Sequence, residues 1–248
     1  MRSQNKIVIA GTGRAGTTFL VQLLTELGLE TGYDRDNWRG HYYEHCQAGL
    51  ERDLTDADAP RIVKNPALTL ALPELWREGK APAIEHVLIP IRDLQSAARS
   101  RVRVGGDDHE IPGGLWLTTE PDRQAEALAV AFHEFLHAVA QEGVPFTLLA
   151  FPNFATDADY CFSRLRFLIA GTSREEFHQA FRRCARPELI HVYATEKTHS
   201  DPAILASYKR KMTEDRQARR RRRWQRITAS CVASLLTFGV IYLLFQRH

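Results

Sequence analysis

Short apolar runs alternate with segments of helical periodicity along residues 6–184. The runs predict four buried strands, at residues 6–10, 61–64, 85–91 and 145–151. The segments whose apolar positions repeat about every 3.6 residues predict helices at about residues 16–28, 93–103, 122–142, 157–170 and 173–184. Strands separated by helices are typical of the α/β class, so the expected fold is a three-layer domain with a parallel sheet flanked by helices.

The carboxyl ends of these strands are the expected place for a binding site, because ligands of open parallel sheets bind there. In this chain the strands end near residues 10, 64, 91 and 151. Residues 104–121 lack a clear periodicity and are rich in Gly, Asp and Pro, which predicts a mobile loop that contacts a substrate. Trp116 in this stretch is expected either to stack on an acceptor, such as a sugar ring, or to anchor the loop to the core.

The C-terminal part of the chain is apolar and follows a basic segment. Residues 227–245 carry no charge, and a helix of that length extends about 28 Å, close to the hydrocarbon core of a bilayer. Arg219–Arg223 and Trp224 precede this stretch, so the positive-inside rule predicts a C-terminal transmembrane helix with the preceding residues in the cytoplasm. Membrane lipid is the expected partner of this anchor, and a buried C-terminal helix is the alternative.

The expected domains are residues 1–200 as the α/β domain, 201–226 as a basic helical stalk and 227–245 as the anchor. The chain has 248 residues with 44% hydrophobic content, enough for the core of one such domain. Its net charge of +3 comes from seven arginines between Arg216 and Arg226. Because the charge is local, we expect no general nucleic-acid surface, and a nucleic-acid role of the arginine run is the weaker alternative.

The cysteines and histidines do not predict a disulfide framework or a metal site. The four cysteines, Cys46, Cys161, Cys184 and Cys231, contain no CxxC pair, and no apolar signal region opens the chain, so a reducing compartment is expected. No His/Cys cluster has zinc-ligand spacing. His133 and His137 share a predicted helix face without a third ligand, which favours a structural role.

A glycine-rich loop follows the first predicted strand directly, at Gly11–Thr18. Glycines allow a backbone to approach an anion closely, and the positive end of the following helix adds to the attraction. The loop is near the Walker pattern GxxxxGK[ST], so the predicted sheet is of the P-loop type, but Thr17 stands where that pattern has lysine. The missing lysine argues against an ordinary ATPase or kinase, because it normally reaches the terminal phosphates.

The loop resembles the 5′-phosphosulfate loop of the sulfotransferases, whose usual pattern is [KR]-[ST]-G-T-[ST]. The matching residues here are Arg14, Ala15, Gly16, Thr17 and Thr18, after Gly13. The match is nearest to the tyrosylprotein sulfotransferases and similar bacterial enzymes, in which arginine takes the first position. Ala15 departs from the common serine, and we expect this to be tolerated because backbone groups do most of the binding.

Two further motifs match the same family, in the expected order within residues 11–100. Arg92 ends a predicted strand and Ser100 lies eight residues later, as in the family's 3′-phosphate motif. Lys64-Asn65-Pro66 is similar to the Lys-Asp-Pro of tyrosylprotein sulfotransferases, whose lysine contacts the sulfate; Asn65 replaces the aspartate, which puts the orientation of Lys64 in doubt. Beyond about residue 105 the resemblance is architectural only.

The resemblance implies a sulfotransferase with 3′-phosphoadenosine 5′-phosphosulfate (PAPS) as donor and no metal. It implies that Arg14 and Lys64 stabilise the leaving phosphate and that six residues of the loop, Gly13 to Thr18, bind the donor together with Arg92 and Ser100. A general base is expected between the first two strands, where Glu44 is the favoured residue and His41 the next. A base in the predicted loop is the remaining option, at Asp107, Asp108 or His109.

Two other functions compete with this hypothesis. One is a P-loop nucleotide-dependent kinase, against which Thr17 argues. The other is a non-catalytic nucleotide-binding membrane adaptor that keeps the fold. The acceptor is expected to be a hydroxyl or amine of a glycan, lipid or protein near the membrane.

Overall fold

The computed structural model describes residues 5–43, 48–105 and 114–190. The expected stalk and apolar anchor, and therefore the membrane prediction, lie outside these ranges. Within them, no helix is both long enough and apolar enough to cross a membrane.

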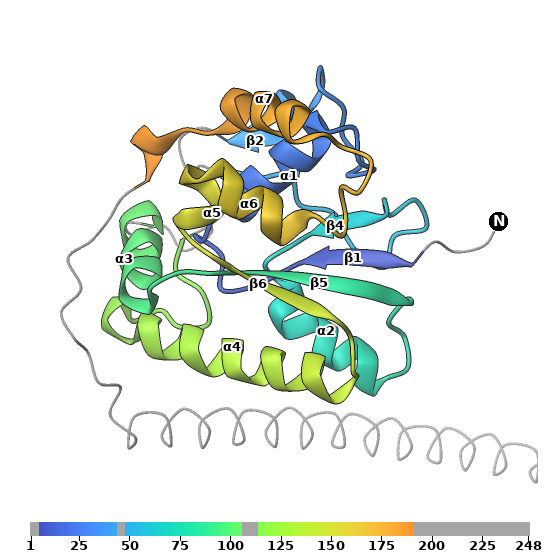
Figure 1. Cartoon of the computed structure of the whole chain (residues 1–248). Coiled ribbons are helices and arrows are strands. Elements are labelled where there is room, and N and C mark those ends of the chain that lie inside the picture. The colour runs from blue at the N-terminus through green and yellow to red at the C-terminus, as the bar shows by residue number, and fades with distance from the viewer. Residues whose placement is uncertain (1–4, 44–47, 106–113, 191–248) are drawn as a thin grey trace, which may run out of the picture. The chain divides into compact units, whose positions relative to one another are not determined.

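The described residues form a four-stranded parallel sheet at the centre of the domain (Figure 1). Its order is β4 (Ile62–Lys64), β1 (Lys6–Ile9), β5 (Ile84–Ile91) and β6 (Phe146–Ala150). The register places Val8 opposite both Val63 and Val87, in the middle of the sheet. The four predicted strands are therefore confirmed, and all four point the same way.

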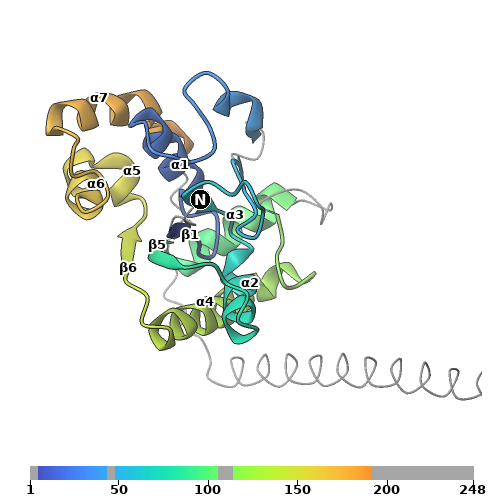
Figure 2. The ribbon, with the colours of Figure 1, turned by 90° about the vertical axis from the view of Figure 1, so that its right-hand side faces the viewer.

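Helices cover both faces of this sheet, as Figures 1 and 2 show. One layer contains α1 (Thr17–Glu26), α5 (Asn153–Thr156), α6 (Ala158–Leu165) and α7 (Arg174–Cys184). In the other layer, α2 (Leu68–Arg77) and α4 (Gln124–Gln141) cover the sheet, and α3 (Leu94–Gly105) packs against α4. The predicted α/β class with helices on both faces is confirmed.

Alternating side chains of the strands fill two separate cores. Ile7 and Ile9 of β1 pack with α1, α6 and α7, while Val8 and Ala10 pack with α2 and α4. Successive residues of a strand point to opposite faces, so a continuous apolar run is what a sheet buried on both sides requires. This is why the run at residues 6–10 identified a central strand.

Several elements were not predicted. Helix α2 contains Pro73, which removes a backbone donor and ordinarily argues against a helix, yet Leu68 and Leu72 anchor the helix in the core. A short antiparallel hairpin of β2 (Tyr42–Tyr43) and β3 (Ala48–Gly49) lies between β1 and β4 in sequence. Three 3₁₀ turns complete the described elements: η1 (Trp38–His41), η2 (Pro121–Arg123) and η3 (Pro187–Leu189).

Two predicted boundaries were wrong. Helix α6 ends at Leu165, five residues before the predicted end, and residues 166–168 form a turn. Helix α3 continues to Gly105, into the stretch predicted as a loop. Residues 106–113 of that stretch, with Asp107, Asp108 and His109, lie outside the described residues.

Candidate functional site

A cleft with a volume of about 1160 Å³ opens at the carboxyl ends of the strands. Residues that follow each of the four strands line it: Gly13, Lys64, Arg92 and Phe151. Small-molecule sites usually occupy about 300–1000 Å³, so this cleft has room for a nucleotide and part of a second ligand. The cleft lies where the strand pattern predicted a binding site.

The glycine-rich loop enters this cleft in an unusual backbone conformation. Gly13, Arg14 and Gly16 have φ angles of 68°, 53° and 78°, in the left-handed region. A Cβ at Gly16 would lie 2.9 Å from ring atoms of Phe151 and Phe154, so both the angle and the space require glycine there. Turns that contain left-handed residues can direct successive N–H groups toward one side and form a concave anion site.

The loop leaves several backbone donors unused. Within the described part of the chain, no acceptor is found for the N–H groups of four loop and first-turn residues: Gly13, Ala15, Gly16 and Thr17. Gly16 is the N-cap of α1 and lines the cleft, so the positive end of the helix also faces the cleft. No side chain of the cap residue occupies the free N–H groups there. Such a set of donors is suited to an anion.

Helix α2 is hydrogen-bonded to the loop. Neither this helix nor its contact with the loop was predicted from the sequence. The Thr69 hydroxyl donates to the Gly11 carbonyl at 2.7 Å and accepts from the Gly11 N–H at 3.0 Å. Thr69 is buried, and this pair of bonds ties the loop's first residue to α2.

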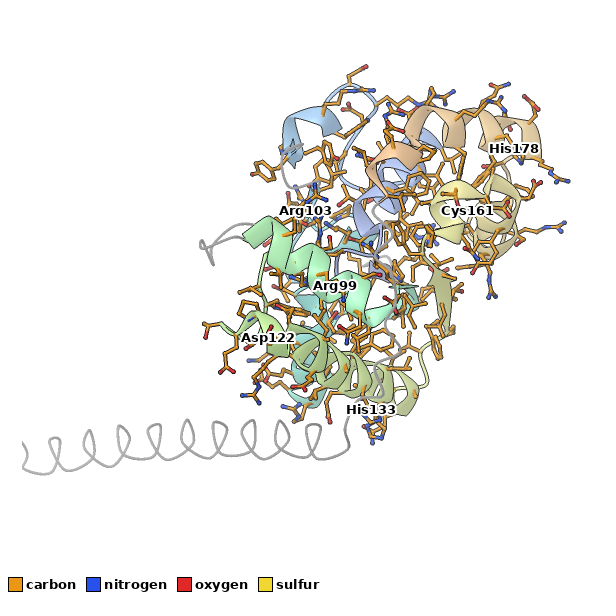
Figure 3. All side chains as sticks on the ribbon, turned by 90° about the vertical axis from the view of Figure 1, so that its left-hand side faces the viewer. Arg99, Arg103, Asp122, His133, Cys161 and His178 are labelled. Carbon is orange, nitrogen blue, oxygen red and sulfur yellow. The ribbon has the colours of Figure 1, made fainter. Side chains whose placement is uncertain are left out.

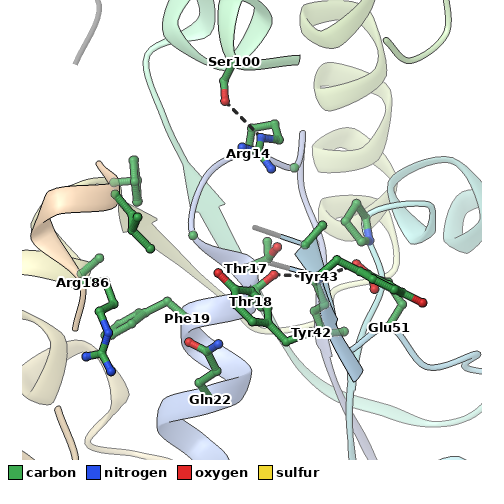
Figure 4. Close-up of a pocket in the computed structure, with 18 of the residues that line it drawn as sticks. Arg14, Thr17, Thr18, Phe19, Gln22, Tyr42, Tyr43, Glu51, Ser100 and Arg186 are labelled. Atoms are coloured by element: carbon green, nitrogen blue, oxygen red, sulfur yellow. Dashed lines mark hydrogen bonds and ion pairs between the residues drawn. The ribbon is translucent and has the colours of Figure 1, made fainter. Parts of the chain in front are cut away.

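Three of the predicted donor-binding residues meet beside the loop. The Arg14 side chain donates through Nε to the Ser100 hydroxyl at 3.0 Å, and the Arg92 guanidinium donates to the Arg14 carbonyl at 2.9 Å (Figure 4). Arg92 also lies over the Phe151 ring, 5.0 Å from its centroid. The structure therefore brings the predicted 5′-phosphate loop and the predicted 3′-phosphate motif into direct contact.

Ala15, the departure from the family pattern, is fully buried and does not line the cleft. Its neighbours Gly16, Thr17 and Thr18 do line it. The replacement of serine by alanine at this position therefore takes no hydroxyl away from the cleft surface.

Lys64 is buried at the end of β4, with 2% of its surface exposed. Its ammonium donates to the Gly49 carbonyl at 2.8 Å, to the Thr18 hydroxyl at 3.4 Å and to the Glu51 carboxylate. The contact with Thr18 places this charge at the first turn of α1. Gly49 belongs to the hairpin and Glu51 lies two residues after it, so this segment orients the lysine even though Asn65 replaces the aspartate of the similar motif.

Among the described residues, Glu51 and Glu188 are the acidic residues that line the cleft, and the sequence reasoning selected neither of them. Glu51 is the one that pairs with Lys64. Figure 4 shows Glu51 with Tyr42 and Tyr43 on one side of Thr18, and Arg186 beyond Phe19 on the other. The predicted base Glu44 lies outside the described residues. His41 contacts the Tyr33 ring, with centroids 5.3 Å apart, and does not line the cleft. The base was expected between the first two predicted strands, and Glu51 lies in that interval. This expected position was the signal that could have identified Glu51.

Trp116 anchors its segment to the core. Its backbone N–H donates to the Gln124 side chain at 2.7 Å, and its carbonyl accepts from Gln124 at 2.8 Å. The ring packs against buried residues of α3 and α4 and also lines the cleft. The anchoring interpretation is therefore confirmed, while stacking on an acceptor stays a prediction.

The histidines and cysteines of the described residues are further candidates for metal ligands or a nucleophile. The described residues contain no group of three or more His, Cys, Asp and Glu side chains able to hold a metal ion. His133 and His137 stack in parallel at 6.3 Å, and Figure 3 shows His133 on the outer side of α4. Cys184 lines the cleft, but burial, and secondarily Glu26, raises its pKa to about 12, so the thiol is protonated at neutral pH.

Comparison with known proteins finds similarity among solved structures. No protein-family model matches the sequence, and no curated protein matches it. Among solved structures, the chain is similar to the sulfotransferase domain from the curacin biosynthetic pathway, with 14% sequence identity, a TM-score of 0.45 and coverage of 83% of each chain.

Proposed function

We propose that this protein is a PAPS-dependent sulfotransferase that moves a sulfuryl group to a hydroxyl or amine. The observation that supports it best is the contact of Arg14 with both Ser100 and Arg92. Two motifs that resemble the two phosphate sites of one donor, and that lie some 80 residues apart in sequence, meet in one cleft. An ordinary mononucleotide has no need for the second phosphate site.

The proposed reaction is an in-line displacement at sulfur. The acceptor oxygen or nitrogen forms a bond to sulfur, the bond between sulfur and the bridging phosphate oxygen breaks, and 3′,5′-adenosine bisphosphate (PAP) leaves with the electron pair. Negative charge therefore develops on the 5′-phosphate. The unused N–H groups of the loop and the charges of Arg14 and Lys64 are fixed before the reaction, which is the condition under which electrostatic stabilisation is most effective.

The acceptor is proposed to enter on the side of the cleft where Tyr42, Tyr43 and Glu51 lie (Figure 4). Lys64 donates to the Glu51 carboxylate on this side of the cleft. The cation proposed to lie beside the sulfuryl group is therefore adjacent to a carboxylate that can take the acceptor's proton. Glu51 is thus a second candidate for the general base. Glu44 remains the other proposed base.

The membrane anchor and the acceptor class remain proposals that depend on the sequence alone. An anchor at residues 227–245 would hold the cleft at the cytoplasmic face, close to lipids, lipid-linked glycans and membrane proteins. Flotation of the full chain with vesicles tests the anchor, and labelled PAPS added to membranes identifies the sulfated product. Failure to float would remove the reason for a membrane-proximal acceptor.

The donor assignment is tested by thermal unfolding of the full chain, purified in mild detergent. PAP is expected to stabilise the protein by about 2.7 kcal/mol at a concentration of 100 times its Kd. ADP at the same concentration lacks the 3′-phosphate and should stabilise it far less, because Arg92 and Ser100 then lose their ligand. Equal stabilisation by PAP and ADP would remove the role of the 3′-phosphate site, and stabilisation by ATP alone would support the kinase alternative.

Glu51→Gln tests the base. The amide keeps the shape but cannot take a proton, so the turnover number is expected to fall by about 100-fold or more while PAP affinity stays within a few-fold of the wild type. Glu85→Gln is a matched control, because Glu85 pairs with Arg61 outside the cleft. Turnover of Glu51→Gln within a few-fold of the control would exclude Glu51 and leave Glu44 as the residue to replace next.

A further inference from the structure

Arg101 is a buried cation beneath the glycine-rich loop. It belongs to α3, next to Ser100, and only 5% of its surface is exposed. Its guanidinium donates through Nε and Nη2 to the Thr12 carbonyl, at 3.2 and 2.7 Å, and through Nη1 to the Gly114 carbonyl at 2.7 Å. It also lies over the Trp116 ring, 4.9 Å from the centroid. The side chain therefore joins the loop to the segment that Trp116 anchors.

This charge is not neutralised in the described part of the chain. All the hydrogen-bond acceptors of Arg101 there are backbone carbonyls, and no carboxylate pairs with it. Burial, and secondarily the neighbouring Arg14 charge, lowers the pKa of Arg101 to about 9. Both arginines line the cleft. The buried positive charge of Arg101 costs free energy unless an anion in the cleft compensates for it.

The bonds to Thr12 also determine how the loop presents its donors. A trans peptide directs its C=O and N–H to opposite sides, so holding the Thr12 carbonyl against Arg101 turns the Gly13 N–H away from that side chain. Gly13 has no side chain that could interfere, and a Cβ there would lie 2.5 Å from Nη2 of Arg101. The guanidinium of Arg101 therefore occupies the space that a Cβ at position 13 would take.

We propose that Arg101 is a positioning residue for the donor: it holds the loop with its N–H groups turned toward the anion and supplies a buried positive charge that the donor's phosphate neutralises. The identity of the anion rests on the proposed function. Without ligand, Arg101 adds to the repulsion in the cleft. With ligand, the same charge adds to affinity.

The proposal predicts a large effect on binding and a small one on the empty protein. Arg101→Gln is expected to weaken PAP binding by about 10- to 100-fold, the range for a lost hydrogen bond to a charged group. The KM for the donor should rise by a similar factor with kcat reduced far less. The melting temperature of the ligand-free protein should change little, because the lost bonds and the removed buried charge act in opposite directions.

Arg103→Gln is the matched control. Arg103, labelled in Figure 3, lies two residues further along the same helix, is exposed and does not line the cleft. PAP affinity of this variant should equal that of the wild type. If Arg101→Gln instead lowers the melting temperature strongly while the folded fraction binds PAP normally, Arg101 is structural and the proposal is wrong.

Arg101→Lys keeps the inference testable if the glutamine variant does not fold. A single ammonium retains the charge but cannot bridge the Thr12 and Gly114 carbonyls as the planar guanidinium does, so PAP affinity should fall by about 5- to 10-fold with the fold intact. Wild-type affinity would overturn the proposal. Pyrophosphate binding separates the donor assignment from the role of Arg101. If the wild-type protein binds pyrophosphate but not PAP, the donor assignment is wrong. Loss of pyrophosphate binding in Arg101→Lys would still support the positioning role of Arg101.

Discussion

Lys64→Met is expected to lower the rate of sulfuryl transfer by about 100- to 1000-fold, the usual result when a fixed donor at a developing negative charge is removed. Lys64 is the buried cation at the first turn of α1, through its bond to the Thr18 hydroxyl. Methionine fills similar space without a charge, so the leaving phosphate loses its stabilisation. PAP affinity should change less than the rate, because the charge on the phosphate increases as the bond to sulfur breaks. Single-turnover kinetics with labelled PAPS and PAP titration measure the two effects.

The outcome must be separated from damage to the hairpin. Lys64 also donates to the Gly49 carbonyl and pairs with Glu51, so its loss removes the partner of one hairpin group and of one group just after the hairpin. Lys80→Met is the matched control, since Lys80 is an exposed lysine paired with Glu78 outside the cleft. A Lys64→Met variant that unfolds at the wild-type temperature, binds PAP and still transfers sulfate at the control's rate would show that Lys64 has no role in the chemistry.

Gly16→Ala is expected to destabilise the fold by about 3 kcal/mol or more and to abolish PAP binding, because it combines a left-handed backbone with overpacking. The new methyl group would lie 2.9 Å from the rings of Phe151 and Phe154. Phe154 is fully buried, so its ring cannot move aside without disturbing the core. The loop would shift instead, and its N–H groups would lose their common direction. Denaturant unfolding and PAP titration measure both results.

Gly28 offers a close control for this substitution. Gly28 has the same φ of 78°, but a Cβ there would meet nothing within 4 Å. Gly28→Ala should therefore cost only the backbone strain, about 1 to 2 kcal/mol, and leave PAP binding unchanged. If the two alanine variants are equally stable and bind PAP equally well, close packing at Gly16 does not shape the loop.

Features that depend on neighbouring residues in sequence could be read from the chain. The apolar runs Ile7–Ile9 in β1 and Val87–Pro90 in β5 identified strands buried on both faces, because consecutive apolar side chains are stable only there. The loop at Gly11–Thr18 could be recognised because glycine spacing is itself the local signal. Helix α2 could not, because Pro73 breaks the local rule and the packing of Leu72 compensates for it.

The sequence by itself thus determined the α/β class and the strands, and it selected Arg14, Lys64, Arg92 and Ser100 as site residues, all of which line the cleft. Only the tertiary structure decided what these residues touch. The pairing of Lys64 with Glu51 depends on the segment that follows the hairpin, and the contact of Arg101 with Thr12 depends on how α3 is placed beside the glycine-rich loop. Such contacts join positions 13 and 89 residues apart, and no local pattern encodes them, because the free energy of a buried charge is set by everything that surrounds it.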